Sequence, residues 1–161
     1  MEQFQIARDD AIKKLKLADH MLTITYQLVQ DPKLLLAVLE NIFHSLNNAM
    51  NSILYYDRLF KRIPILPDSF EAKLNIFKTM CAPRYNIKRE YIDLIRDIRD
   101  IIINHKSSPI EFARKDKFVI CSDNYKMKTI SIPDIKKYIA QAKLFIIDMS
   151  SIVEKNEGIF R

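Results

Sequence analysis

The chain has 161 residues, of which 48% are hydrophobic and 29% charged, values typical of one globular domain and not of a disordered chain. It contains a single glycine, Gly158, which excludes glycine-rich phosphate loops and dinucleotide fingerprints because these need several glycines close together. The formal net charge of +6 permits an anionic partner such as RNA but does not require one.

The start of the chain and its cysteines indicate a reducing compartment. The first four residues, Met-Glu-Gln-Phe, are acidic and lead into no apolar signal segment. Cys81 and Cys121 lack the spacing of a metal site or a disulfide framework, and we expect each to be a buried small hydrophobic residue. The sequence therefore predicts a cytoplasmic domain over residues 1–161, with no membrane span, no cofactor and no metal.

Helical periodicity dominates the first half of the chain. Apolar residues recur every three or four positions over residues 3–29, which predicts an amphipathic helix. Asp31 and Pro32 then supply an N-cap and a first-turn proline for a second helix over residues 32–61. Two prolines in residues 63–68 end this helix, because proline removes a backbone donor and clashes with the preceding turn.

Two further helices are predicted after the prolines. Asp68 or Ser69 can cap a helix that runs to Met80 and is ended by Pro83. The next helix covers residues 86–104 and carries a seam of apolar residues at alternating spacings of three and four. Because Tyr91, Ile98 and Ile102 form the apolar face of this amphipathic helix, we expect the chain to form a homodimer.

The remainder of the chain predicts a short β-hairpin and a last helix. Ser108 and Glu111 have the spacing of a capping box and are expected to open a single helical turn. Residues 117–121 and 126–130 have strand character and flank a polar connection. A final helix is expected from Ser131 to about residue 154. The predicted fold is therefore all-α, an antiparallel bundle of about five helices with a small hairpin before the last one.

The role of the hairpin, residues 117–130, is not decided by the sequence. It can cover one end of the bundle, pair with a second subunit or contact substrate.

One motif in the chain can carry chemistry. Arg99 and Asp100 are followed by three isoleucines, Asn104 and His105. In a helix, Arg99 and His105 are about 9 Å apart along the axis and about 120° apart around it, so they do not share a face. We expect the helix to fray near His105, which would let the imidazole swing toward the guanidinium.

This pattern resembles the signature of the HEPN (higher eukaryotes and prokaryotes nucleotide-binding) family, an arginine, a polar residue, a short apolar stretch and a histidine. The resemblance implies a bundle of antiparallel helices that dimerises and acts as a metal-independent endoribonuclease, often as a toxin or defence effector. Arg99 and His105 would be the catalytic residues across a homodimer cleft. Asp100 and Asn104 would support them, and Lys106 would contact the RNA backbone.

The two residue types suit RNA cleavage without a metal. Histidine can take a proton from a ribose 2′-hydroxyl and return one to the leaving oxygen. Arginine is permanently charged and can hold the phosphate through paired hydrogen bonds. Attack by the neighbouring 2′-hydroxyl would leave a 2′,3′-cyclic phosphate.

The same motif also has an interpretation in which Arg99 and His105 have structural and not catalytic roles. Arg99 can be a surface residue that forms an ion pair, for instance with Glu111, and His105 can be a half-buried residue that suits the negative end of its helix. The chain would then be a non-catalytic helical interaction module, for example the partner of a nucleotidyltransferase in a toxin–antitoxin pair.

Two other clusters have both a functional and a plain interpretation. Arg58, Lys61 and Arg62 follow adjacent tyrosines and can bind single-stranded RNA, or they can form a solvated helix end. A polar strip on the second helix can be surface, an inter-helix hydrogen-bond network, or a wall of the cleft that holds His105. Its members are His44, Asn47, Asn48 and Asn51. Glu40 and His44 lack the partner residues that a di-iron bundle needs.

Overall fold

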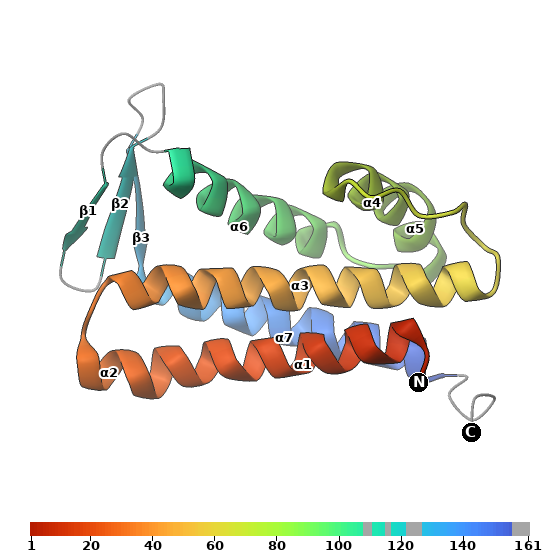
Figure 1. The fold of residues 1–161 in the computed structure, drawn as a ribbon, viewed down its shortest axis with the longest axis horizontal. Helices are drawn as coiled ribbons and strands as arrows, with labels where there is room; N and C mark the ends of the chain where they lie inside the picture. The colour runs from red at the N-terminus through yellow and green to blue at the C-terminus, as the bar shows by residue number, and fades with distance from the viewer. Residues whose placement is uncertain (108–110, 115–116, 122–126, 156–161) are drawn as a thin grey trace.

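Two long helices, α1 (Gln3–His20) and α3 (Lys33–Leu59), run antiparallel side by side and form the frame of the fold in this computed structural model (Figure 1). The structure describes the backbone of residues 1–107, 111–114, 117–121 and 127–155, and the side chains of residues 1–105 and 129–155. The helices within these ranges are α1 (Gln3–His20), α2 (Tyr26–Val29), α3 (Lys33–Leu59), α4 (Phe70–Ile76), α5 (Ala82–Tyr85), α6 (Arg89–Ser107) and α7 (Ile132–Glu154). The strands are β1 (Glu111–Arg114), β2 (Lys117–Cys121) and β3 (Met127–Ser131).

Figure 1 shows how the remaining elements surround the α1–α3 pair. Helix α7 lies behind the pair and runs parallel to α3, whereas α6 runs antiparallel to α3 above it. The short helices α4 and α5 cover the C-terminal half of α3. The sheet stands at the opposite end, beside the end of α6 and the start of α7. The predicted all-α antiparallel bundle is confirmed.

Helices α1 and α3 pack closely because small residues line their contact. The alanines Ala7, Ala11, Ala18 and Ala49 are all buried. Two buried serines of α3 also bond the backbone of α1: Ser45 Oγ donates to the Ala11 carbonyl and Ser52 Oγ to the Phe4 carbonyl, each at 2.7 Å. These bonds satisfy the buried hydroxyls and fix the register of the two helices.

The predicted first helix is interrupted but not ended. A π-helical turn at Met21–Thr25 joins α1 to α2, and Gln30 then closes the segment in a left-handed conformation with φ 54°. Asp31 Oδ1 accepts the Lys33 backbone N–H at 3.0 Å. Helix α3 starts one residue later and ends two residues earlier than predicted, and the N-cap is Pro32, so the predicted N-cap at Asp31 is wrong.

The third predicted helix ends later than expected. Ser69 is its N-cap and accepts the Ala72 N–H at 3.1 Å. A π-helical turn at Phe77–Cys81 then joins α4 to α5, so the helical path continues through Pro83 to Tyr85 and the expected stop at Pro83 is wrong. Proline is tolerated there because Pro83 lies in the first turn of α5, where a missing N–H costs little.

Helix α6 begins and ends about three residues later than predicted. Asn86 has φ 56° and closes α5, so it cannot start the next helix. At the other end α6 continues to Ser107, which includes His105. In α7 the Ser131–Asp134 capping box forms as a reciprocal pair, with Asp134 Oδ2 accepting the Ser131 N–H at 2.9 Å.

The hairpin is confirmed but has a third strand. Strands β2 and β3 pair antiparallel, with Phe118 opposite Ile130, and β1 pairs with the other edge of β2. The helical turn expected over residues 108–111 is wrong at Glu111, which starts β1. Ladder pairing with β2 supplies backbone partners that a single helical turn cannot match. Residues 108–110 lie outside the described part of the chain.

One core runs through the bundle and uses residues of every long helix. It includes Tyr91 at 4% exposure and Ile98 at 0%, with the half-buried Ile102 packed against it. The seam that motivated a homodimer is therefore used inside the protomer. Cys81 is buried as predicted, and the side chain of Cys121 lies outside the described part. In the described ranges, no helix has the length and apolar character needed to cross a bilayer.

Candidate functional site

Arg99 lies midway along α6 and reaches across to α4. Its Nη1 forms an ion pair with Glu71 Oε1 at 2.6 Å, and its guanidinium carbon stands 4.5 Å from the centroid of the Phe70 ring. The Arg99 side chain is 30% exposed and that of Glu71 67% exposed. The guanidinium is therefore held by one aromatic face and one solvated carboxylate, and part of it stays open to water.

The ring under Arg99 belongs to a continuous aromatic row. The centroids of Phe70 and Phe43 are 5.6 Å apart, and those of Phe43 and His44 are 6.0 Å apart. Phe70 and Phe43 are half-buried, and His44 is exposed. We call this surface, formed by Arg99, Phe70, Phe43 and His44, the Arg99 face. It joins α6, α4 and α3.

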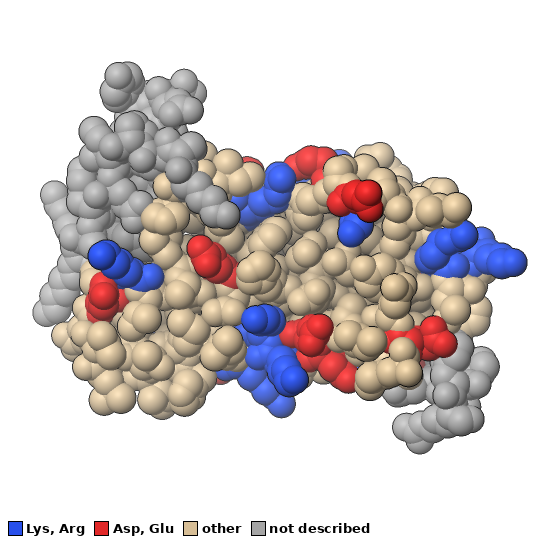
Figure 2. All heavy atoms as spheres, viewed as in Figure 1, with Lys and Arg blue, Asp and Glu red and all other residues tan. Residues whose placement is uncertain are grey.

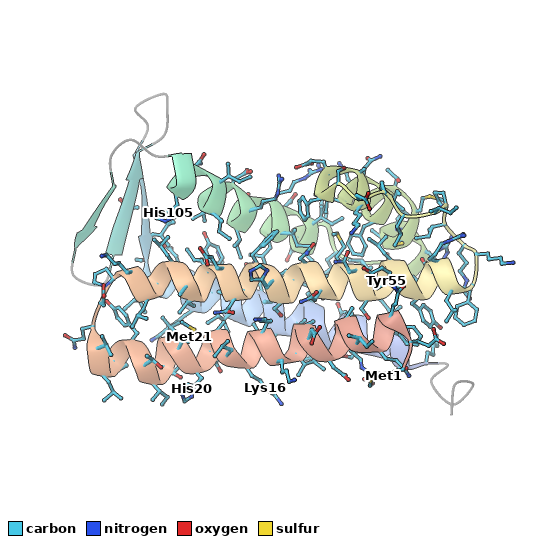
Figure 3. The ribbon with its side chains drawn as sticks, viewed as in Figure 1. Met1, Lys16, His20, Met21, Tyr55 and His105 are labelled. Atoms are coloured by element: carbon cyan, nitrogen blue, oxygen red, sulfur yellow. The ribbon has the colours of Figure 1, made fainter. Side chains whose placement is uncertain are left out.

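His105 occupies the far end of α6, close to the sheet (Figure 3). Its side chain is half-buried, and its Nδ1 atom is buried. The expected fraying is wrong, because α6 continues for two residues beyond His105. The angular separation of about 120° from Arg99 is therefore retained, and Arg99 is drawn toward α4. Within one protomer the fold does not bring the two side chains together.

The predicted supporting residues differ in their surroundings. The side chain of Asp100 is exposed to solvent, whereas that of Asn104 is half-buried. The backbone of Lys106 belongs to α6, and its side chain lies outside the described residues. Arg99 pairs with Glu71 in the structure, and the side chain of Glu111, the partner considered in the sequence analysis, lies outside the described residues.

The residues of the polar strip on α3 differ in how far they are exposed. His44 is exposed, Asn47 and Asn48 are half-buried and Asn51 is 9% exposed. His44 belongs to the Arg99 face, whereas Asn51 is largely enclosed by the core. The strip therefore contributes His44 to the surface near Arg99.

The predicted basic cluster after the tyrosines divides between two places. Arg58 Nη1 donates to the Ile63 carbonyl at 3.2 Å and lines a groove with Tyr55. Lys61 is exposed in a left-handed turn with φ 56°. Arg62 instead donates to the Tyr85 hydroxyl at 3.0 Å and lines a different pocket. Arg58 and Arg62 therefore line two different pockets, and RNA binding by the three cations stays a prediction.

Among the residues with described side chains, the most buried charged residue is Asp57, which was not among the site residues predicted from the sequence. Its carboxylate is 0% exposed and accepts hydrogen bonds from Arg84 Nη1 at 2.6 Å and from the Tyr85 hydroxyl. Arg62 Nη1 lies 3.6 Å from Asp57 Oδ1. Burial and the bond to Asp57 raise the pKa of Tyr85 above its usual value.

A signal for Asp57 was present in the helical pattern of α3. Leu46, Met50, Ile53 and Asp57 follow one another at spacings of four, three and four, and all four are fully buried. A carboxylate on the buried stripe of a helix requires cationic partners, because burying a lone charge is costly. The partners Arg84 and Tyr85 come from another helix, so their identity was not visible locally.

Charge on the surface is mixed in sign. On the face drawn in Figure 2, lysine and arginine side chains are interspersed with acidic ones and form no continuous basic band. Among the residues with described side chains, no three histidine, cysteine or acidic groups gather as a metal site would need.

Comparisons with known proteins gave no relative. No protein-family profile, no curated protein and no solved structure matched this chain.

Proposed function

We propose that the chain is a HEPN-like, RNA-binding cytoplasmic domain that acts as a metal-independent endoribonuclease. Its Arg99 face contacts the RNA, and Arg99 and His105 of two protomers meet across a homodimer cleft. The observation that carries the proposal is the partly exposed Arg99 guanidinium on the row of Phe70, Phe43 and His44. Bases of single-stranded RNA stack on such aromatic surfaces, and arginine binds the phosphates between them.

Glu71 is the group that RNA would displace. The Glu71 side chain is 67% exposed. An ion pair with such a solvent-exposed partner contributes little to stability, about 0–1 kcal/mol. A phosphate carries the same sign of charge as the carboxylate and offers paired acceptors to the guanidinium. Glu71 therefore holds Arg99 in place without closing it to a ligand.

The chemistry needs a second protomer. Because Arg99 and His105 point in different directions on α6, one helix cannot present both to the same phosphate. In the proposed dimer, His105 takes the proton of the 2′-hydroxyl, the 2′-oxygen attacks the phosphorus, and Arg99 stabilises the charge on the phosphate oxygens. The bond between phosphorus and the 5′-oxygen breaks, the 5′-oxygen takes the proton that His105 returns, and a 2′,3′-cyclic phosphate remains.

The test is cleavage of single-stranded RNA in EDTA, with identification of the 3′ end of the product. We expect cyclic-phosphate ends from the wild-type chain and a loss of at least about 100-fold with His105→Ala or Arg99→Ala. Arg89→Ala is the matched control, because Arg89 is on the same helix and its side chain is 76% exposed. Circular dichroism reports whether each variant keeps its helices.

Three parts of the proposal can be contradicted separately. No cleavage by the wild-type chain, or equal cleavage by Arg99→Ala and Arg89→Ala, refutes the catalytic part. RNA affinity that is equal in Arg99→Ala and the wild type refutes the Arg99 face. A wild-type chain that sediments as a monomer at micromolar concentration in the presence of RNA refutes the shared cleft.

A second candidate is a non-catalytic interaction module, such as the partner of a nucleotidyltransferase in a toxin–antitoxin pair. An apolar groove of about 280 Å³ between α1 and α7 favours it. Ile12, Leu15 and Ile147 line the groove, and Ile147 is 63% exposed. Purified nucleotidyltransferase from the same genome should then bind the wild-type chain and lose at least about tenfold in affinity with Ile147→Asp. Unchanged affinity would refute this surface.

A further inference from the structure

A pocket with several polar side chains in its lining lies at the opposite end of the bundle from His105. It has a volume of about 500 Å³ and opens where α3, α5 and α7 end. Figure 1 shows these three helix ends together, on the side of the molecule away from the sheet. The polar lining comes from Arg62, Arg84, Tyr85, Asn86, Ser151 and Lys155.

The described residues around this pocket carry an excess of positive charge. Arg62, Arg84 and Lys155 line it, and in the described part of the chain the carboxylate that pairs with the two arginines is the buried Asp57. The neighbouring Glu154 lies toward Arg8 instead, at 3.6 Å from its Nη1. Asp57 pairs with Arg62 and Arg84, and Lys155 adds a third cation to the described lining, so the described side chains give the pocket a positive character.

The arginines are held in place rather than free to sample solvent. Arg84 Nη1 is bound to Asp57 at 2.6 Å, and Arg84 Nη2 lies 3.4 Å from the Arg62 carbonyl. Arg62 stacks on Phe60 at 4.9 Å and donates to the Tyr85 hydroxyl. Despite these contacts the side chains of Arg62 and Arg84 are 37% and 33% exposed. Preorganised cations of this kind lose little entropy when they bind an anion.

From this arrangement we propose that the pocket binds the terminal phosphate of a nucleotide-sized ligand. A phosphate monoester carries between one and two negative charges near neutral pH, which suits the positive character of the pocket. Arg62, Arg84 and Lys155 bind the phosphate, and Ser151 and Asn86 supply further hydrogen-bonding groups. A pocket of about 500 Å³ is within the range that accommodates small molecules.

The proposal is independent of the Arg99 face and of any nuclease activity. The phosphate can belong to a free mononucleotide or to the end of an RNA chain, because the chemistry that is recognised is the same. Neither Arg62 nor Lys155 touches Arg99 or His105 in any described contact, so a pocket variant leaves the proposed catalytic residues intact.

The test is isothermal titration of the full chain with AMP, adenosine and inorganic phosphate. We expect AMP to bind, adenosine to bind at least about tenfold more weakly, and inorganic phosphate to compete with AMP. A charge-assisted hydrogen bond corresponds to about a tenfold change in affinity or more. Lys155→Gln and Arg62→Gln should therefore each weaken AMP binding by at least that factor. Two short RNAs, with and without a 5′ phosphate, separate a nucleotide site from an RNA-end site.

Lys143→Gln is the matched control, because Lys143 is an exposed lysine of the same helix that pairs with Asp19 at 3.2 Å, away from the pocket. This variant removes the same charge and should bind AMP as the wild type does. Lys155 is exposed at the end of α7, so its variant should fold normally. Equal binding of AMP and adenosine, or equal losses in Lys155→Gln and Lys143→Gln, would overturn the proposal. So would the absence of AMP binding, because the cations would then serve only Asp57 and the helix ends.

Discussion

Asp57→Asn is the substitution for which the structure makes the sharpest prediction. The change keeps the size of the side chain but replaces a carboxylate, which only accepts hydrogen bonds, by an amide with one acceptor oxygen and two donor hydrogens. Asp57 is surrounded by donors, namely Arg84, the Tyr85 hydroxyl and the Cys81 thiol. The amide NH₂ would therefore point at a donor, and one of these groups would lose its acceptor.

The expected loss of stability is about 3 kcal/mol. Removing one partner of a buried ion pair costs about 3–5 kcal/mol. The lower value applies here because Arg84 is 33% exposed, so water can partly solvate its charge once the carboxylate is gone. Urea denaturation followed by circular dichroism at pH 7 measures the free energy of unfolding of the wild type and of the variant.

A double-mutant cycle tests whether the loss comes from the Asp57–Arg84 pair. Arg84→Met removes the charge that Asp57→Asn would strand, so the double variant should be more stable than the sum of the two single losses predicts. We expect a coupling energy of at least about 1 kcal/mol, since residues of one network interact by about 0.5–3 kcal/mol. A loss below about 1 kcal/mol for Asp57→Asn, or strictly additive losses, would refute the reasoning.

Two further predictions concern buried groups of the core. Ser45→Ala and Ser52→Ala should each lower the free energy of unfolding by about 1 kcal/mol by removing a buried bond to α1, and the two losses should add. The exposed hydroxyl of Thr23 bonds only its own helix, so Thr23→Ala is the control and an equal loss there would contradict the idea. Burial, and then the bond to Asp57, raise the pKa of the Cys81 thiol. The neutral thiol therefore makes its full contribution to the free energy of unfolding below the pKa of the unfolded state, about 8.5. As the pH rises above that value the contribution is lost, by up to about 1.4 kcal/mol per pH unit. Urea denaturation between pH 7.5 and 10 should thus show a steeper decline for the wild type than for Cys81→Ala, and parallel declines would count against this assignment.

Local patterns in the sequence predicted the helices well because their causes are local. The apolar spacing of α1, α3 and α7 reports one buried stripe per helix, and Ser69 and Ser131 cap their helices through bonds to residues three positions away. The predicted ends of helices were wrong where the backbone adopts a π-helical turn or pairs with a strand, because the spacing of apolar side chains does not encode these conformations. The helical path through Pro83 depends on the π-helical turn before it, and β1 forms because β2 offers it a partner.

The candidate sites were only half visible in the sequence. The motif of Arg99 and His105 could be found from residue types and spacing, and so could the basic character of Arg62. The partner of Arg99 could not, because Glu71 and Phe70 are 28 and 29 positions away in the chain and meet it only when α4 packs beside α6.

What the sequence by itself determined was the class of fold, the long helices, the caps Ser69 and Ser131, and the presence of a helical motif that carries arginine and histidine. Only the tertiary structure decided which cation each carboxylate contacts. It directed Arg99 toward α4 and gathered Arg62, Arg84 and Lys155 at one end of the bundle. The physical reason is that helix formation depends on neighbours within about four residues, whereas ion pairs and pockets depend on which helix ends the packed core brings together.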